Sequence, residues 1–148
     1  MIWRQAWENL SLQRKGRDAA LQENAGGLDQ RCRVDQFRLE QVFRNIFENS
    51  LAACTDPVRV VVNCTAAGLN AQSAVQVTVC DNGPGLTAEQ RQRVFDPFFT
   101  TKTKGTGLGM AIAKRIVEAH DGQISVGSES GSGAEIRIIL PHQPVSNL

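Results

Sequence analysis

The amino-acid sequence predicts an α/β (α+β) fold in which helices cover one face of a single mixed β-sheet. Segments rich in β-branched residues alternate along the chain with segments of helical spacing, and glycine-containing turns separate them. The chain has 148 residues, of which 41% are apolar and 21% charged, and these values fit one globular domain.

The N-terminal part of the chain is predicted to hold a helix followed by two short strands. Trp3 and Trp7 lie at helical spacing, which indicates an amphipathic helix over residues 3–14 or the end of a longer one. We expect weak strands over residues 17–25 and 30–34, with paired glycines in the turn between them.

The middle of the chain contains the most strongly predicted helix. Asp35 is its expected N-cap, and Pro57 lies beyond its end. Its apolar residues recur at steps of three and four: Leu39, Val42, Phe43, Ile46, Phe47 and Leu51. Two β-branched strands should follow over residues 58–66 and 74–81, joined by a loop over residues 67–73.

The C-terminal part is predicted to contain two more helices and a closing hairpin. Thr87 should cap a short helix. A second strong helix is expected over about residues 107–119, stopped by Gly122. The residues expected on its apolar face are Leu108, Ile112, Ile116 and Val117. Strands over residues 123–130 and 134–141 should then pair as a hairpin.

Charge and cysteine content exclude several classes of function. The formal net charge is +1 and no apolar run approaches the ~20 residues that span a bilayer, so we expect neither a nucleic-acid partner nor direct membrane contact. The cysteines form no CxxC pair, so we expect no zinc site but free thiols in a reducing compartment, the cytoplasm. They are Cys32, Cys54, Cys64 and Cys80.

Two asparagines lie one turn apart on the middle helix. Asn45 and Asn49 share one face at the border of the apolar stripe, although asparagine is a poor helix former. Amide oxygens are hard ligands and suit Mg²⁺ that is also held by phosphates and water. The pair alone is more typical of a solvated polar patch, and both interpretations stay open.

Residues 81–86, DNGPGL, put an acidic residue at the end of an apolar strand. A simple turn between strand and helix explains the glycines but not Asp81. A carboxylate there could accept a hydrogen bond from an exocyclic amine such as that of adenine. Gly83 and Gly85 would let a flat ring approach the backbone closely.

A second glycine cluster leads directly into the second strong helix. Gly105, Gly107 and Gly109 precede or begin this helix, whose free N–H groups and partial positive charge favour anions such as phosphate. The spacing matches neither a dinucleotide-binding fingerprint nor a P-loop. The alternative is a helix start that uses glycine for packing alone.

Three phenylalanines fill the segment between the two glycine clusters. Phe95, Phe98 and Phe99 could dock a loop whose glycines act as hinges, so that it forms a lid. Lys102 and Lys104 would then lie over a triphosphate. The alternative is a loop with an apolar plug and two solvated lysines.

Taken in order, these segments resemble the catalytic ATP-binding domain of sensor histidine kinases, of the GHKL superfamily. RNIFENSLAA, DNGPGL, FDPFFTTK and GTGLGMAIAKRIVEAHDG are similar to that family's N-box, first glycine box, F-box and second glycine box. The resemblance covers about residues 17–141, which we take as the ATP-binding domain. Residues 1–16 would then be the end of a linker or helical hairpin, and residues 142–148 a tail.

The resemblance implies a Bergerat-type fold, a two-layer sandwich with three helices on one face of a mixed sheet, which binds ATP and Mg²⁺. It implies that Asn49 binds Mg²⁺, that Asn45 supports it toward the phosphates, and that Asp81 binds the adenine amine. Gly83 and Gly85 would shape that pocket. The residues implied at the phosphates are Lys102, Gly105, Thr106, Gly107, Leu108 and Gly109.

The sequence also departs from the family. Where the family often has threonine after its last GxG, this chain has Ala134, so we expect a polar contact to adenine to be missing. The phosphoacceptor histidine is absent. His120 falls at the end of the second strong helix, where we expect a capping cation or a packing residue, and His142 falls in the tail.

The implied reaction moves the γ-phosphoryl group of ATP to a histidine on a dimerisation domain of the same full-length protein, outside this chain. A response regulator receiver domain would accept it next. We expect Asn49 and Lys102 to serve catalysis by positioning and charge neutralisation, and Glu48 is a candidate general base or a solvated residue. Two alternatives are an anti-sigma-type serine kinase, which usually lacks a segment like residues 95–102, and a nucleotide-binding module without kinase activity.

Overall fold

The computed structural model describes residues 1–25, 32–100, 107–127 and 133–142. Within them, one sheet has the strand order β1-β2-β3-β5-β4, with β1 and β2 parallel and all other neighbours antiparallel. The strands are β1 (Ala19–Asn24), β2 (Val58–Leu69), β3 (Gln72–Asp81), β4 (Gln123–Val126) and β5 (Glu135–Pro141). The predicted mixed sheet is confirmed.

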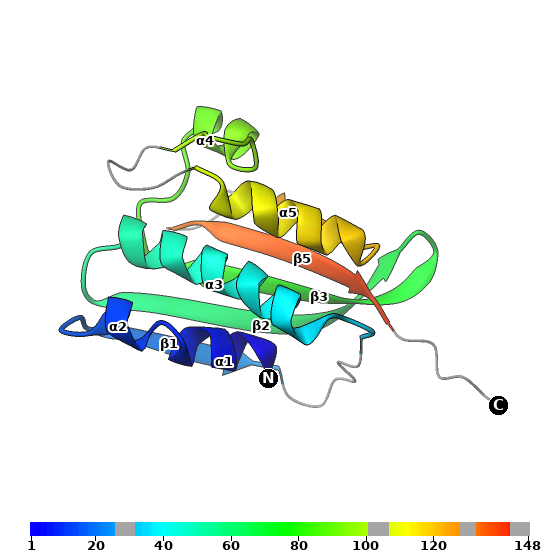
Figure 1. Cartoon of the computed structure of the whole chain (residues 1–148), viewed down its shortest axis with the longest axis horizontal. Coiled ribbons are helices and arrows are strands. Elements are labelled where there is room, and N and C mark those ends of the chain that lie inside the picture. Colours follow the sequence, from blue (N-terminus) through cyan, green and yellow to red (C-terminus); the bar gives the residue numbers. More distant parts are fainter. Residues whose placement is uncertain (26–31, 101–106, 128–132, 143–148) are drawn as a thin grey trace.

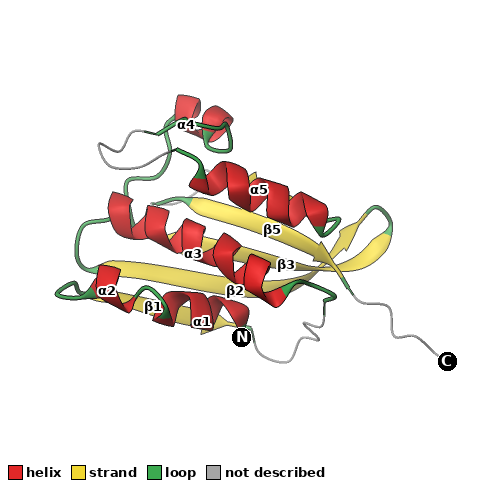
Figure 2. Cartoon of the chain, in the orientation of Figure 1, coloured by secondary structure: helices red, strands yellow, loops and turns green. Residues whose placement is uncertain are grey.

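The helices lie on one face of this sheet (Figures 1 and 2). They are α1 (Ile2–Glu8), α2 (Ser11–Arg14), α3 (Gln36–Ala53), α4 (Ala88–Arg93) and α5 (Gly109–Ala119). α1, α3 and α5 run side by side over the sheet, while α4 lies outside this layer near the start of α5. The two-layer sandwich with three covering helices is therefore confirmed.

Local sequence signals explain where the main helices begin. The Asp35 side chain accepts a hydrogen bond from the Arg38 N–H at the start of α3, as expected of an N-cap. Thr87 caps α4, and its side chain and that of Gln90 form a reciprocal capping box. The six apolar residues predicted for α3 are all buried, so its stripe faces the sheet as expected.

Helix α1 packs into the same core as the rest of the chain. Trp3 lies edge-on to Phe43 at 5.8 Å between ring centroids, and Trp7 lies edge-on to Phe47 at 5.4 Å. Both tryptophans are buried, as is Leu10. The division of the chain at residues 16 and 142 stays a prediction, but the core is continuous across residue 16.

Three elements differ from their predictions. The single helix expected over residues 3–14 is instead two helices, α1 and α2, with Asn9 and Leu10 between them. The strand expected at residues 30–34 is wrong for its described part, because residues 32–34 pair with no strand and Val34 packs against the core instead. The loop expected at residues 67–73 is also wrong. β2 and β3 pair as far as Leu69 and Gln72, and a two-residue turn joins them with φ of 51° at Asn70 and 63° at Ala71.

The apolar face of α5 also differs in part. Ile116 and Val117 are buried as predicted, but Ile112 is 36% exposed, so its placement was wrong. Met110 and Ala113 are buried in its place, because residues 110, 113, 116 and 117 recur at steps of three and four and form the core-facing stripe, with Ile112 at its edge.

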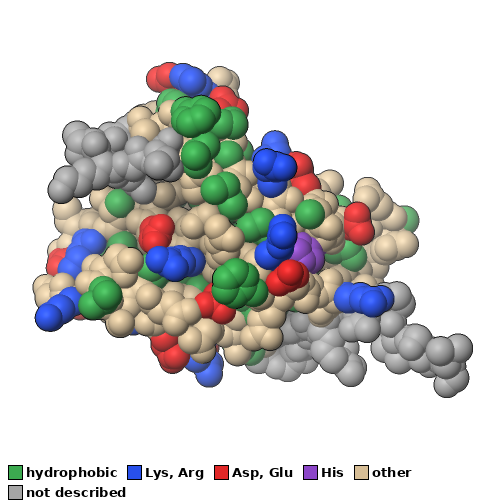
Figure 3. All heavy atoms as spheres, viewed as in Figure 1, with side chains coloured by type: hydrophobic (Ala, Val, Ile, Leu, Met, Phe, Trp, Pro, Cys, Tyr) green, Lys and Arg blue, Asp and Glu red, His purple; other side chains and the backbone are tan. Residues whose placement is uncertain are grey.

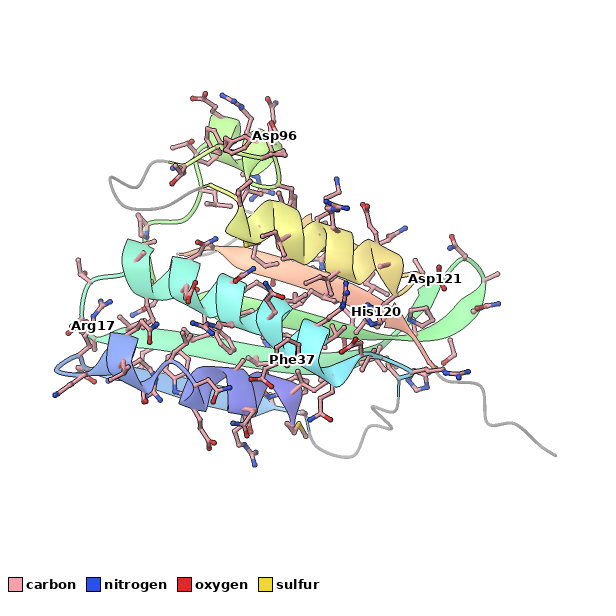
Figure 4. All side chains as sticks on the ribbon, in the orientation of Figure 1. Arg17, Phe37, Asp96, His120 and Asp121 are labelled. Atoms are coloured by element: carbon pink, nitrogen blue, oxygen red, sulfur yellow. The ribbon has the colours of Figure 1, made fainter. Side chains whose placement is uncertain are left out.

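His120 joins the end of α5 to the start of α3 (Figure 4). The backbone N–H of Asp35 donates to its Nε2 at 2.9 Å, and its Nδ1 lies 2.7 Å from the Ile116 carbonyl oxygen. His120 thus ties the last turn of α5 to the start of α3, which fits the packing residue of the two options.

The surface of the helix face mixes acidic and basic side chains (Figure 3). Hydrophobic side chains gather on this face over α4 and the nearby chain. In the part of the chain that the structure describes, no helix combines the length and the apolar character needed to cross a bilayer.

Glu23 on β1 should make stability depend on pH. Hydrogen bonding to Arg4, aided by its charge and by the Trp3 N–H, lowers the pKa of the Glu23 carboxyl. A carboxyl whose pKa is lower in the folded state than in the unfolded state stabilises the fold above its unfolded-state pKa. This stability is lost as the pH falls through the folded-state pKa. We therefore expect Glu23→Gln to lower the unfolding free energy by about 1 kcal/mol at neutral pH.

Denaturant unfolding of both proteins across the acidic range checks this expectation. The difference between wild type and Glu23→Gln should shrink toward zero as the pH falls through the lowered carboxyl pKa. Glu89→Gln, whose side chain is 70% exposed on α4, is the control and should change little. A pH-independent difference for Glu23→Gln would contradict the assignment.

Candidate functional site

A cavity of about 830 Å³ lies between the helix layer and one end of the sheet. Its volume lies in the range of small-molecule sites. α3, the start of α5, the ends of β3 and β5, and the segment around α4 all contribute to its wall. Its apolar part comes from Ile46, Val79, Met110 and Ile136.

Helix α3 supplies the polar wall of the cavity. Asn45, Glu48 and Asn49 all line it, so the two asparagines do not form a merely solvated patch. The Asn45 amide donates to the Gly109 carbonyl oxygen at 2.8 Å and so ties α3 to the first residue of α5. The Glu48 carboxylate accepts from Arg44 at 3.2 Å, and its side chain is 39% exposed.

Asp81, the last residue of β3, lies opposite α3 and also lines the cavity. Its Oδ1 accepts backbone N–H bonds from Gly83 and Ala134, each at 3.0 Å. Its Oδ2 accepts from the Ser50 hydroxyl at 2.9 Å. The carboxylate is therefore held in one orientation by donors from three separate segments.

The two glycines of residues 81–86, Gly83 and Gly85, differ in their surroundings. Gly85 lines the cavity, whereas Gly83 is not among the lining residues. A Cβ at Gly83 would lie 2.8 Å from the Cys54 sulfur and 3.2 Å from Asp81 Oδ1. Gly83 thus lets the turn pack against Cys54 and donate to Asp81, rather than making room for a ring.

Gly133 holds the other side of Asp81. It has a φ of +102°, and a Cβ there would lie 1.8 Å from the Asp81 carbonyl oxygen. A side chain at this position would therefore separate the end of β3 from the start of β5. Asp81 N–H in turn donates to the Ala134 carbonyl oxygen at 3.0 Å.

The start of α5 faces the cavity. Gly107, Gly109 and Met110 line it, whereas Leu108, the N-cap residue, is not among the lining residues. The N–H groups of the first turn of α5 therefore begin at the cavity wall, and this is the arrangement that favours a bound anion.

The three phenylalanines of the predicted lid do not share one environment. Phe95 packs against the core, with the Lys114 ammonium 5.8 Å from its ring centroid. Phe99 lines the cavity, with the Arg93 guanidinium 4.6 Å from its ring. Phe98 is 75% exposed. Its backbone N–H donates to the Gly107 carbonyl oxygen and so links residue 98 to the residue that lies two positions before α5.

Four residues predicted at the phosphates or over them lie outside the described residues. They are Lys102, Lys104, Gly105 and Thr106. Their roles stay predictions.

Sequence reasoning missed three residues that hold Asp81. Ser50 had a usable signal, because it falls on the buried stripe of α3 four residues after Ile46, where an isolated hydroxyl needs a partner. Cys54 and Gly133 gave no such local signal, since their contacts with the turn and with Asp81 depend on segments far apart in the sequence.

The side-chain oxygen atoms on the α3 side of the cavity are of the kind that Mg²⁺ binds. Those of Asn45, Glu48 and Asn49 are amide and carboxylate oxygens, and the cavity-lining residues that the structure describes include no histidine or cysteine. Hard oxygen donors of this kind suit Mg²⁺, which keeps several waters and substrate phosphates as ligands.

Comparison with known proteins identifies the family. The sequence model of the histidine kinase-, DNA gyrase B- and HSP90-like ATPases matches residues 34–144. The chain belongs to this family. It is thereby a catalytic ATP-binding domain of the type found in sensor histidine kinases, and the resemblance drawn from the sequence is confirmed.

Three relatives support the family assignment. Sensor histidine kinase ZraS of Escherichia coli O157:H7 is 36% identical over 138 residues, which cover 90% of this chain but 29% of ZraS. The nucleotide-free catalytic domain of histidine kinase ThkA matches with a TM-score of 0.80 at 26% identity, over 95% of this chain and 90% of that chain. Full-length ShkA in complex with AMPPNP matches with a TM-score of 0.73 at 28% identity, over 95% of this ATPase-family chain and 29% of that chain.

Proposed function

We propose that this chain binds Mg-ATP in the 830 Å³ cavity and transfers the γ-phosphoryl group to a histidine on a dimerisation domain outside this sequence. An aspartate on a response regulator receiver domain would then accept the group. The observation that supports this most is the convergence of Asp81, Asn49 and the start of α5 on one cavity. The relative ShkA binds AMPPNP, an ATP analogue.

The adenine end of the nucleotide is assigned to Asp81. Its carboxylate is an acceptor at the cavity wall, fixed by the Ser50 hydroxyl and two backbone N–H groups, and it meets the exocyclic amine of adenine. The apolar side chains of Ile46, Met110 and Ile136 flank the place where the ring would lie. Binding and orientation of the base thus come from residues that are already in position.

The phosphate end is assigned to the opposite part of the cavity. The N–H groups at the start of α5 face the phosphates, with Lys102 as a further contact. Asn49 would hold Mg²⁺, with Asn45 keeping the start of α5 against α3. When bound, Mg²⁺ neutralises phosphate charge and aligns the transferred group.

Glu48 is assigned to the histidine that accepts the phosphoryl group. It lies next to Asn49 on the cavity wall, and Arg44 holds its carboxylate. A carboxylate there can take up the proton of an incoming imidazole as the phosphoryl group moves. The reaction would take place in the cytoplasm, where the free thiols of this chain stay reduced.

Asn49→Ala should abolish the effect of Mg²⁺ on nucleotide binding. The change removes the amide oxygen assigned to the metal and leaves the adenine contacts intact. Calorimetric titration with ATP, with and without Mg²⁺, should show a Mg²⁺-dependent affinity in wild type and none in the variant. Asn9→Ala, on the exposed end of α1, should behave as wild type. A wild-type Mg²⁺ dependence in Asn49→Ala would refute the assignment.

Phosphoryl transfer tests the proposed function directly. The chain is mixed with γ-labelled ATP and the histidine-bearing dimerisation domain of the full-length protein. We expect acid-labile label on the acceptor histidine. Nucleotide binding without any transfer would favour a binding module, and acid-stable label on a serine of a partner would favour the anti-sigma type of kinase.

A further inference from the structure

We propose that Ser50 sets the base preference of the cavity by holding Asp81 as a pure hydrogen-bond acceptor. The inference rests on the proposed function, because it concerns the base of the nucleotide bound there. Ser50 acts through Asp81 and is therefore a positioning residue.

Ser50 is placed where a hydroxyl has no reason to be for packing alone. It is 4% exposed on the core-facing side of α3, between the buried residues Phe47 and Leu51. Alanine would fit that stripe without needing a partner. The hydroxyl instead donates to Asp81 Oδ2 at 2.9 Å, and both residues line the cavity.

The remaining donors leave Asp81 a single orientation. Oδ1 already accepts from Gly83 and Ala134, so a rotation of the carboxylate would break both bonds. Ser50 contributes a side-chain hydroxyl to Asp81, whereas Ala134 on the other side contributes a backbone N–H.

The Cys54 thiol also contacts the Asp81 carboxylate. Burial, followed by the negative charge of Asp81 and a hydrogen bond to it, raises the pKa of the Cys54 thiol to about 11. The thiol is therefore protonated at neutral pH. Arg17 fixes the Cys54 carbonyl oxygen at 2.9 Å, so the end of α3 is held in place behind the site.

This arrangement selects among purines. The Ser50 hydroxyl uses its hydrogen in the bond to Asp81. The Ser50 oxygen and Asp81 Oδ2 can therefore only accept further hydrogen bonds, and both would face the same edge of the base. Adenine offers an amine at that edge, which donates. Guanine offers a carbonyl oxygen there, which would face acceptors only, and an unpaired buried polar group is costly.

The test compares Ser50→Ala with wild type by titration with Mg-ATP and Mg-GTP. Wild type should prefer ATP, and Ser50→Ala should lower the ratio of ATP to GTP affinity about tenfold, because the site loses one of the two acceptors that face the amine of adenine. Ser50→Thr keeps the hydroxyl and should retain most of the wild-type ratio. Ser125→Ala, at an exposed serine of β4, is the matched control.

Two results would overturn the role of Ser50, and a third would overturn the proposed function. A wild-type ratio in Ser50→Ala, or an equal loss of both nucleotides, would overturn the inference, because Ser50 would then be structural or inert. Loss of the preference in Ser50→Thr would overturn it as well, independently of how well Ser50→Ala folds. Failure of wild type to bind either nucleotide would instead overturn the proposed function.

Discussion

Replacing Asp81 by asparagine should weaken ATP binding by about 100-fold or more while leaving the fold in place. The asparagine oxygen can accept the N–H bonds of Gly83 and Ala134, and its amide can donate to the Ser50 oxygen. The internal bonds are thus satisfied, so the unfolding free energy should change by less than about 1.5 kcal/mol. The cavity wall, however, would now present a donor to the donating amine of adenine.

The same variant should bind GTP relatively better, since a donor at that position suits the guanine carbonyl oxygen. Calorimetric titration with both nucleotides, together with thermal unfolding, measures the two effects separately. Asp121→Asn is the matched control, because Asp121 is exposed at the far end of α5 (Figure 4) and its φ of 60° is one that asparagine adopts readily. Unchanged ATP affinity in Asp81→Asn would remove Asp81 from the adenine site.

Replacing Trp7 by alanine should lower the unfolding free energy by about 3–5 kcal/mol. Trp7 is 7% exposed, packs edge-on against Phe47, and carries the Arg14 guanidinium 4.8 Å from its ring centroid. Its loss would leave a large cavity between α1 and α3. Since α3 also forms the polar wall of the proposed nucleotide site, affinity for ATP should fall as the domain unfolds.

Denaturant unfolding with Leu12→Ala as control checks this expectation. Leu12 is 82% exposed on α2, so its truncation should change stability by less than about 0.5 kcal/mol. A small effect of Trp7→Ala would mean that residues 1–16 form a detachable linker and that the core begins at residue 17. The predicted loss would place α1 inside the folding unit.

Elements with strong local signals were predictable from the sequence. The apolar stripe and Asp35 cap of α3 and the Thr87 cap of α4 depend on residues within a turn or two of each other. The alternation that suggested a strand near Cys32 and Val34 reflects two apolar residues packed against the core, which a short pattern cannot distinguish from strand pairing.

The sequence analysis singled out Asp81 and Asn49 because polar side chains are unusual at the end of an apolar strand and at the border of an apolar stripe. The structure places both on the wall of one cavity, and their roles stay predictions. The support around Asp81 was not predictable. The Ser50 bond, the contact of Gly83 with Cys54 and the approach of Gly133 join residues 29 or more positions apart, so only the assembled sheet and helix layer bring them together.

A crystal structure of the chain grown with Mg²⁺ and a non-hydrolysable ATP analogue tests the central claim most directly. We expect the exocyclic amine of adenine within hydrogen-bond distance of Asp81 and the phosphates between Asn49 and the start of α5. A nucleotide bound elsewhere, or a base whose amine points away from Asp81, would contradict the account.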